Sequence, residues 1–139
     1  MKIISQNLLL FAFLLLAYTL AFRFGLSTLL PAEKWIWVIV ISVVYGAAIF
    51  VTAWTTGKRD GMNNFLFDAG FRWNLTTFIV WGAASEAWFL LGLHSTYESI
   101  RVVHITLLIW SGFLILHLIL FLILRRRTIK GIHKTDIFE

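Results

Sequence analysis

Residues 35–56 read WIWVIVISVVYGAAIFVTAWTT, a run that contains no charged side chain. A helix needs about 20 predominantly apolar residues to cross a hydrocarbon core about 30 Å thick, and this run supplies them. A small water-soluble domain rarely buries so long an apolar segment on every side. The run therefore predicts a membrane-spanning helix and makes lipid the solvent in which the fold must be explained.

Three further apolar runs accompany this one, separated by short polar joints, at residues 4–30, 71–93 and 102–124. The composition, 60% hydrophobic and 14% charged, is unlike that of a soluble domain or of a disordered chain. We therefore expect an all-α integral membrane bundle of four antiparallel transmembrane helices, built as one domain over residues 1–139. Residues 125–139 are expected to form a short basic tail.

The basic residues lie at the ends of the predicted spans. Of the 12 Lys and Arg residues, only Arg23, Lys34 and Arg101 fall on the side opposite the N-terminus, the 57–70 joint and the tail. Because an excess of Lys and Arg marks the cytoplasmic side, we expect both termini in the cytoplasm and the chain in a cell inner membrane. The basic residues behind the formal net charge of +5 are then expected to contact lipid headgroups. No nucleic-acid partner is expected.

Sequence motifs for catalysis are missing. The chain has no cysteine, which excludes disulfides, thiolate metal sites and cysteine nucleophiles. It also lacks a glycine-rich phosphate loop, a His-Glu-x-x-His pair and a Gly-x-Ser-x-Gly elbow. We therefore expect a protein that is not an enzyme and that needs neither a metal nor a cofactor.

Glu86 is the one acidic residue inside a predicted span, and we place it about 12 Å deep from the outer end of that span. A lone carboxylate at such depth is costly, so it should be protonated, paired or hydrated. Arg23 lies at a comparable depth on the first span, where a bridge to Glu86 would satisfy both charges. His104 lies within one or two turns of Glu86 if the last two spans form a hairpin. We therefore predict an intramembrane polar cluster of Glu86, Arg23 and His104, whose role is either structural or functional.

His104 and His117 lie thirteen residues apart on the last span, a rotation of about 220° on a helix. They therefore should not share one face, which disfavours the stacked two-haem arrangement of membrane cytochromes. Ordinary hydrogen bonding is the more common role for such histidines.

Small and aromatic residues suggest how the helices pack. Residues of small volume recur every four positions at Ala17, Ala21 and Gly25, at Ser42 and Gly46, and at Ala83 and Ala87. Such stripes allow close helix contact and are predicted here as packing seams. The tryptophans divide into four expected interfacial anchors, Trp35, Trp37, Trp54 and Trp73, and three deeper packing residues, Trp81, Trp88 and Trp110.

Residues 71–130 resemble the two-transmembrane domain family that is widespread in Bacteroidetes. The matching positions are Phe71, Leu75, Phe78, Trp110 and His117, followed by a basic tail. Family members usually carry a histidine where this chain has Asn74, and two glycines where only Gly112 is clear. The resemblance implies a bacterial membrane anchor that associates with other proteins, and we take His117, Asn74 and Trp110 as candidate polar or ligand contacts.

Three functional hypotheses follow. The leading one is a non-enzymatic accessory subunit or partner-binding module of a larger inner-membrane assembly, bound to another membrane protein or to a second copy of itself. The alternative is a small transporter or proton-coupled carrier in which Glu86 changes protonation. A haem protein or membrane enzyme that uses His104 or His117 is the least favoured.

Overall fold

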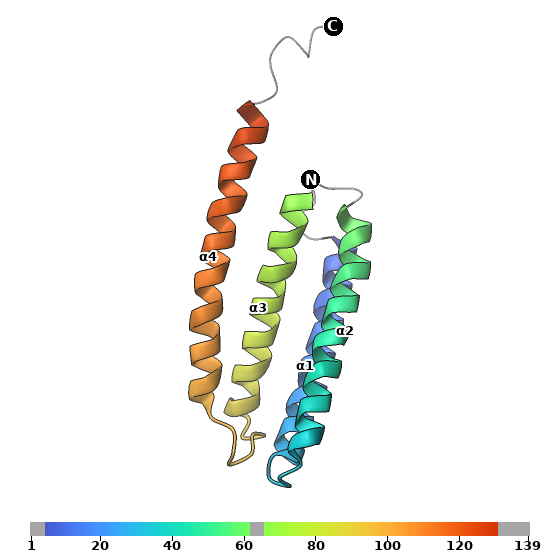
Figure 1. Ribbon diagram of the computed structural model, residues 1–139, viewed down its shortest axis with the longest axis vertical. Coiled ribbons are helices and arrows are strands. Elements are labelled where there is room, and N and C mark those ends of the chain that lie inside the picture. The colour runs from blue at the N-terminus through green and yellow to red at the C-terminus, as the bar shows by residue number, and fades with distance from the viewer. Residues whose placement is uncertain (1–4, 62–65, 131–139) are drawn as a thin grey trace, which may run out of the picture.

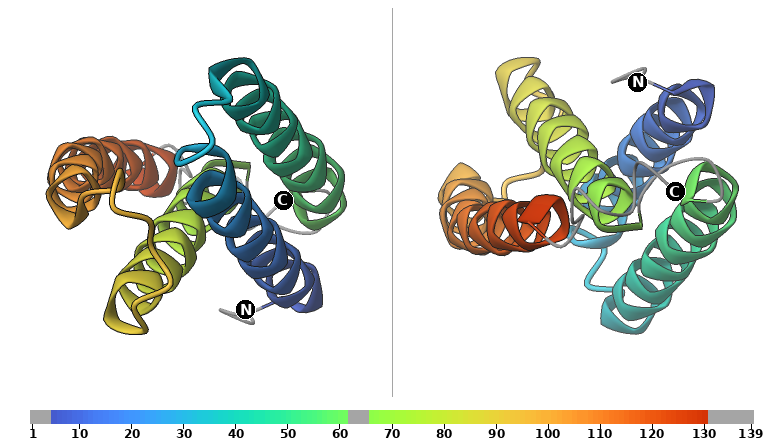
Figure 2. Two further views of the ribbon diagram at one scale, coloured as in Figure 1. Left: turned by 90° about the horizontal axis from the view of Figure 1, so that it is seen from below. Right: turned by 90° about the horizontal axis from the view of Figure 1, so that it is seen from above.

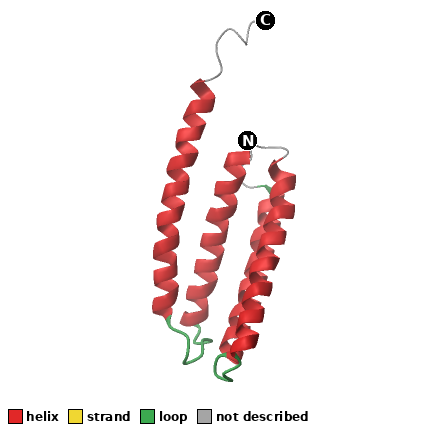
Figure 3. Cartoon of the chain, viewed as in Figure 1, coloured by secondary structure: helices red, strands yellow, loops and turns green. Residues whose placement is uncertain are grey.

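The computed structural model describes residues 5–61 and 66–130, with side chains over 5–59 and 70–123. Within these residues the chain is helical apart from short turns, and no strand occurs (Figure 3). The helices are α1 (Gln6–Leu29), α2 (Trp35–Gly61), α3 (Leu66–Leu90) and α4 (Ile100–Lys130). The expectation of an all-α fold with four helices is confirmed.

The helices extend beyond the predicted spans at one end of the molecule. Helix α2 continues to Gly61 and α3 begins at Leu66, so most of the predicted 57–70 joint is helical. Helix α4 runs on to Lys130 and projects past the other three helices (Figure 1). The first six residues of the expected tail therefore belong to a helix, and residues 131–139 lie outside the described residues.

Three of the four helices are long and apolar enough to cross a membrane, which points to a membrane protein. The qualifying segments are Gln6–Leu29, Trp35–Arg59 and Ile100–Ile123. Helix α3 has a sufficient length of 25 residues but is not among them. The physical reason lies in its composition, because α3 carries Arg72, Asn74 and Glu86 among its apolar residues.

The turns that follow α1 and α3 have the same hydrogen-bonding pattern. Beyond α1, the N–H of Lys34 donates to the Leu29 carbonyl while Glu33 adopts φ +54°. Beyond α3, the N–H of Leu93 donates to the Trp88 carbonyl while Gly92 adopts φ +68°. Both are Schellman motifs, in which a left-handed residue lets the chain satisfy the last helical carbonyls. Glycine accepts that conformation without steric cost, whereas Glu33 does not.

Helix α3 is the centre of the bundle. It packs against α1, α2 and α4, whereas α4 approaches only α3 among the helices that the structure describes. Views along the bundle place α3 between α4 and α1, with α2 beyond (Figure 2). The end of α1 and the start of α2 lie at the same end of the bundle as the end of α3 and the start of α4 (Figure 1).

The buried stripe of α1 repeats every four residues but does not consist of small residues. It is formed by Phe11, Leu15, Thr19 and Arg23. The predicted small-residue seams are wrong at almost every position, since Ala17, Ala21, Ser42, Gly46, Ala83 and Ala87 are all exposed. Only Gly25 faces a neighbour, because a Cβ there would lie 3.0 Å from Ile41 Cδ1. Large side chains fill the interfaces instead, so dispersion contacts rather than close backbone approach hold them together.

The seam between α3 and α4 follows alternating steps of four and three residues on α4. Its members are Val103, Leu107, Trp110, Leu114, His117 and Phe121, each buried or in contact with α3. This spacing is typical of the knobs-into-holes packing of left-handed helix pairs. His117 belongs to the seam and His104 does not, in agreement with the prediction that the two histidines lie on different faces.

The tryptophans divide differently from the prediction at one position. Trp35, Trp37 and Trp54 are exposed, as anchors at a membrane boundary would be. Trp73 is instead a packing residue, because its ring centroid lies 5.0 Å from the ring centroid of Phe11. The three deeper tryptophans pack between helices as predicted, and Trp88 and Trp110 also donate hydrogen bonds.

Candidate functional site

Helix α1 places Arg23 against α3, where its charge is almost completely removed from solvent. Arg23 Nη1 lies 3.5 Å from Glu98 Oε2, and Nη2 donates to Ser85 Oγ at 2.7 Å. The side chains of Arg23 and Glu98 are only 8% and 5% exposed. Trp88 donates to Ser27 Oγ, which in turn donates to Glu98 Oε1 at 2.6 Å. We call these five residues the Arg23 network.

Aromatic rings enclose the guanidinium group of this network. Its carbon lies 5.5 Å from the ring centroid of Trp81 and 5.8 Å from that of Phe89. Trp81, Ser85 and Phe89 are four residues apart, so they share the face of α3 that meets α1. Arg23 Nε is buried and has no hydrogen-bond partner among the described residues. Ion pairing, cation–π contact and burial therefore fix the guanidinium in one position.

Glu98 is positioned by the turn that precedes α4. Its Oε1 atom accepts from the Ser95 backbone N–H at 3.0 Å and from the Ser95 hydroxyl at 3.2 Å. With Ser27 and Arg23, four donors thus converge on one carboxylate, about as many as it can accept. The turn is therefore bound to α1, although α4 itself does not pack there.

Glu86 and His104 form a second, separate pair between α3 and α4. Glu86 Oε1 lies 2.9 Å from His104 Nε2, and the two side chains are 35% and 59% exposed. Because α3 ends at Leu90, Glu86 lies four residues from the helix end, about 6 Å by helical rise and not the predicted 12 Å. The predicted bridge from Arg23 to Glu86 is therefore corrected, because the structure gives Arg23 to Glu98 and Glu86 to His104.

Asn74, Trp110 and His117 form a third cluster, further along the seam between α3 and α4. Trp110 Nε1 donates to Asn74 Oδ1 at 3.0 Å, and Asn74 Nδ2 lies 3.4 Å from His117 Nδ1. The structure thus brings together the three residues that the sequence singled out as candidate polar or ligand contacts. We call this cluster the Asn74 relay.

Sequence reasoning missed Glu98, Ser27 and Ser85, although a signal for Glu98 was present. Ser95 and Glu98 stand in the spacing Ser-x-x-Glu just before an apolar run, the pattern of a capping box. That pattern predicts a carboxylate that turns back toward the backbone, which is half of its observed role. The contact with Arg23 had no sequence signal, because the two residues are 75 positions apart.

The three clusters differ in the chemistry that they can perform. The groups of the Arg23 network bind one another, the Glu86–His104 pair is open to its surroundings, and the Asn74 relay joins an indole, an amide and an imidazole. Among the described residues, no group of three His, Cys, Asp or Glu side chains could hold a metal ion.

No family model, curated protein or solved structure matches the chain. The resemblance of residues 71–130 to the two-transmembrane domain family therefore stays a prediction.

Proposed function

We propose that all four helices cross a cell inner membrane in alternating directions, with both termini in the cytoplasm. Helix α3 is the helix that needs explanation, because it is less apolar than the others. Its position between α1 and α4 supports a crossing, since Ser85, Glu86 and Asn74 find their partners within the protein. A polar residue costs little in a membrane when neighbouring helices satisfy it.

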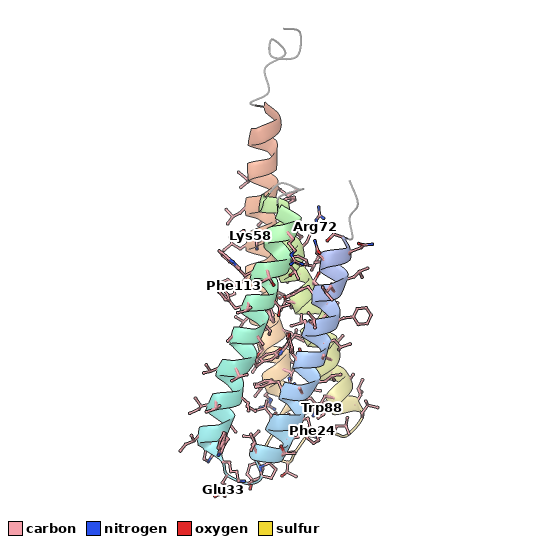
Figure 4. The ribbon with its side chains drawn as sticks, turned by 90° about the vertical axis from the view of Figure 1, so that its right-hand side faces the viewer. Phe24, Glu33, Lys58, Arg72, Trp88 and Phe113 are labelled. Atoms are coloured by element: carbon pink, nitrogen blue, oxygen red, sulfur yellow. The ribbon has the colours of Figure 1, made fainter. Side chains whose placement is uncertain are left out.

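The distribution of charge supports this orientation. Lys58 and Arg72 lie near one end of the bundle, and Glu33 lies at the other (Figure 4). The end with Glu33 also holds Arg23 and Glu98, which neutralise each other. The opposite end carries the excess of positive charge that is typical of a cytoplasmic face.

We infer that the protein is a non-enzymatic accessory subunit or partner-binding module in a larger membrane assembly. The observation that carries this inference is that α4, the longest helix, packs against α3 alone in the described part of the chain. Large apolar side chains such as Leu108 and Phe113 cover the rest of α4, at 73% and 64% exposure. The groups of the Arg23 network are meanwhile bound to one another and leave little free chemistry for catalysis.

Photo-crosslinking in the native membrane tests this proposal. A photoreactive phenylalanine analogue is placed at Leu108 or Phe113 on α4, and at Val43 or Phe50 on α2 as matched exposed controls. After gentle detergent extraction and mass spectrometry, we expect a stoichiometric protein adduct from the α4 positions and lipid adducts from the α2 positions. Lipid adducts alone from all four positions would contradict a partner-binding role for α4.

A proton-coupled carrier is the second candidate, and the half-exposed Glu86–His104 pair favours it. In that case Glu86→Gln should abolish flux in proteoliposomes while the protein remains folded. For an accessory subunit, the same variant should still copurify with its partner. A hollow of about 180 Å³ is lined by Phe50, Val51 and Trp54, which all belong to α2. Because it lies on one helix and not between helices, it does not support the carrier hypothesis.

A further inference from the structure

The hydrogen bonds of the Asn74 relay all run in one direction, which is set by the donor Trp110. The indole N–H of Trp110 can donate but cannot accept, so the Asn74 atom that faces it must be the carbonyl oxygen. The amide nitrogen of Asn74 then faces His117, 3.4 Å from Nδ1. Because an amide NH₂ group only donates, Nδ1 of His117 must accept with its lone pair. Each group in the relay thus fixes the next.

This polarity determines which form of His117 is present. A neutral imidazole whose Nδ1 accepts carries its proton on Nε2. A proton on Nδ1 would place an N–H against the Asn74 NH₂ group, which is a contact between two donors. Ligation of a metal or haem iron through Nε2 is also disfavoured, because that nitrogen has no free lone pair in this form. The relay therefore presents a neutral N–H donor at Nε2.

The donor lies where water is scarce. His117 is seven residues from Leu124, the last apolar residue before Arg125, and so about 10 Å from that end of the apolar run by helical rise. The ring is partly exposed, and Asn74 is its hydrogen-bond partner in the part of the chain that the structure describes. An unsatisfied N–H in hydrocarbon is costly, so an acceptor is required.

The surroundings of the donor suit an apolar, flat or extended molecule. The ring of Phe71 meets His117 edge-on with centroids 5.7 Å apart, and the Phe121 ring stacks on Phe71 at 5.8 Å. Gly70, which is exposed, leaves its backbone open beside His117 Cε1. These neighbours are apolar rings and backbone, and a carbonyl oxygen needs only the one donor.

We propose that His117 Nε2–H binds the carbonyl oxygen of a bilayer-borne molecule, on the lipid-facing side of the seam between α3 and α4. The proposal rests on the membrane crossing proposed above. Two sources have the required chemistry: the ester carbonyl of a phospholipid and the ring carbonyl of a lipophilic quinone. An acceptor on a protein, whether this chain or a partner, is the competing explanation that the experiment must separate.

Solid-state NMR on the full chain in nanodiscs tests the proposal. Histidine is labelled with ¹⁵N, and contacts to ¹³C-labelled carbonyls are measured in three lipid settings. These settings are ester-linked phosphatidylcholine, ether-linked phosphatidylcholine that has no ester carbonyl, and ether-linked lipid with added decylubiquinone. His117→Phe assigns the signal, and His104 is the internal control because its Nε2 is already bound to Glu86.

The expected result is a neutral His117 with its proton on Nε2 and a contact to a labelled carbonyl. A contact in ester lipid identifies the phospholipid, and a contact only with decylubiquinone identifies the quinone. A proton on Nδ1, an imidazolium at neutral pH, or no contact in any setting would overturn the proposal. A hydrogen-bonded Nε2–H in ether lipid without additive would also overturn it, because the acceptor would then be a protein group, a phosphate oxygen or water and not the proposed carbonyl.

A second variant tests the relay without removing the histidine. Trp110→Phe keeps the ring packing but loses the donor, so the Asn74 amide is free to turn. We expect His117 to become a mixture of both neutral forms and its carbonyl contact to weaken. An unchanged tautomer in Trp110→Phe would overturn the relay. Protein that does not insert into nanodiscs would overturn the membrane crossing as well, whereas inserted protein without the contact overturns this site alone.

Discussion

The contact between α1 and α3 and the contact between α3 and α4 treat charge in opposite ways. The first encloses an ion pair, Arg23 with Glu98, whose side chains are less than one-tenth exposed. The second places Glu86 and His104 in contact at its edge, with the histidine more than half exposed. The polar groups of the Asn74 relay lie within the second seam.

The difference follows from how many elements surround each pair. Arg23 is enclosed by α1, α3 and the turn before α4, which together supply a carboxylate, a hydroxyl and two aromatic rings. Such a set can offset the cost of removing a guanidinium from water. Among the helices that the structure describes, α4 packs against α3 alone, and the Glu86–His104 contact stays open to its surroundings. The comparison teaches that a charged pair is buried in this protein where a third element, the turn before α4, joins the two packed helices.

Glu98→Gln should have the largest effect on stability. The amide keeps the size of the carboxylate but leaves Arg23 charged and buried without a counter-ion, and breaking such a pair typically costs about 3–5 kcal/mol. The free energy of unfolding, measured by denaturant titration in mild detergent, should fall by roughly that amount. A loss below about 1 kcal/mol would show that Arg23 is hydrated, and would remove the contrast between the two contacts.

Gly57→Ala should have the next largest effect, at the contact between α2 and α3. A Cβ at Gly57 would overlap the indole ring of Trp73, so α2 and α3 would have to move apart. Overpacking of this kind costs about 1–3 kcal/mol. Gly46→Ala is the matched control, because its Cβ would meet nothing within 4 Å. Equal effects of the two substitutions on unfolding would contradict the close contact at Trp73.

Glu86→Gln should change stability little. Its pair with His104 is open to the surroundings, and exposed pairs contribute about 0–1 kcal/mol. The same titration as for Glu98→Gln provides the comparison, since both substitutions remove one carboxylate charge. A loss as large as that of Glu98→Gln would mean that a further element, such as a bound partner, covers the α3–α4 pair.

Glu33→Gly should have the smallest effect and the opposite sign. Glu33 occupies the left-handed position that Gly92 occupies in the other Schellman turn. Glycine there relieves a cost of about 1–2 kcal/mol, part of which is lost again through the greater freedom of the unfolded chain. We expect a net gain below about 1 kcal/mol in the same unfolding titration. A clear loss would indicate that the Glu33 side chain makes a stabilising contact.

Much of the fold could be predicted from the sequence because it depends on local composition. The expected start of α2 at Trp35 is confirmed, and that of α4 differs by two residues. The helices were predictable because the backbone N–H and C=O groups of a long apolar run in lipid must hydrogen-bond within the segment, which a helix allows. The packing faces were not predictable, because small residues such as Ala17 and Gly46 also suit a surface that faces acyl chains.

Part of the candidate site was also predictable. Asn74, Trp110 and His117 were singled out from sequence and do lie together, since seven-residue spacing on α4 keeps Trp110 and His117 on one face. The pairing of Arg23 was predicted with the wrong acid. Glu86 looked like the better partner because it lies inside a span, and Glu98 looked like a loop residue.

The sequence by itself determined an all-helical chain made for an apolar solvent, because hydrophobic length and charge placement are properties of each segment alone. Tertiary structure decided which acid meets Arg23, which faces of the helices are covered and which ion pair stays open. These choices depend on distances between residues far apart in the chain, and several arrangements satisfy the same apolar pattern. Only the packing of α3 between α1 and α4 selects one of them.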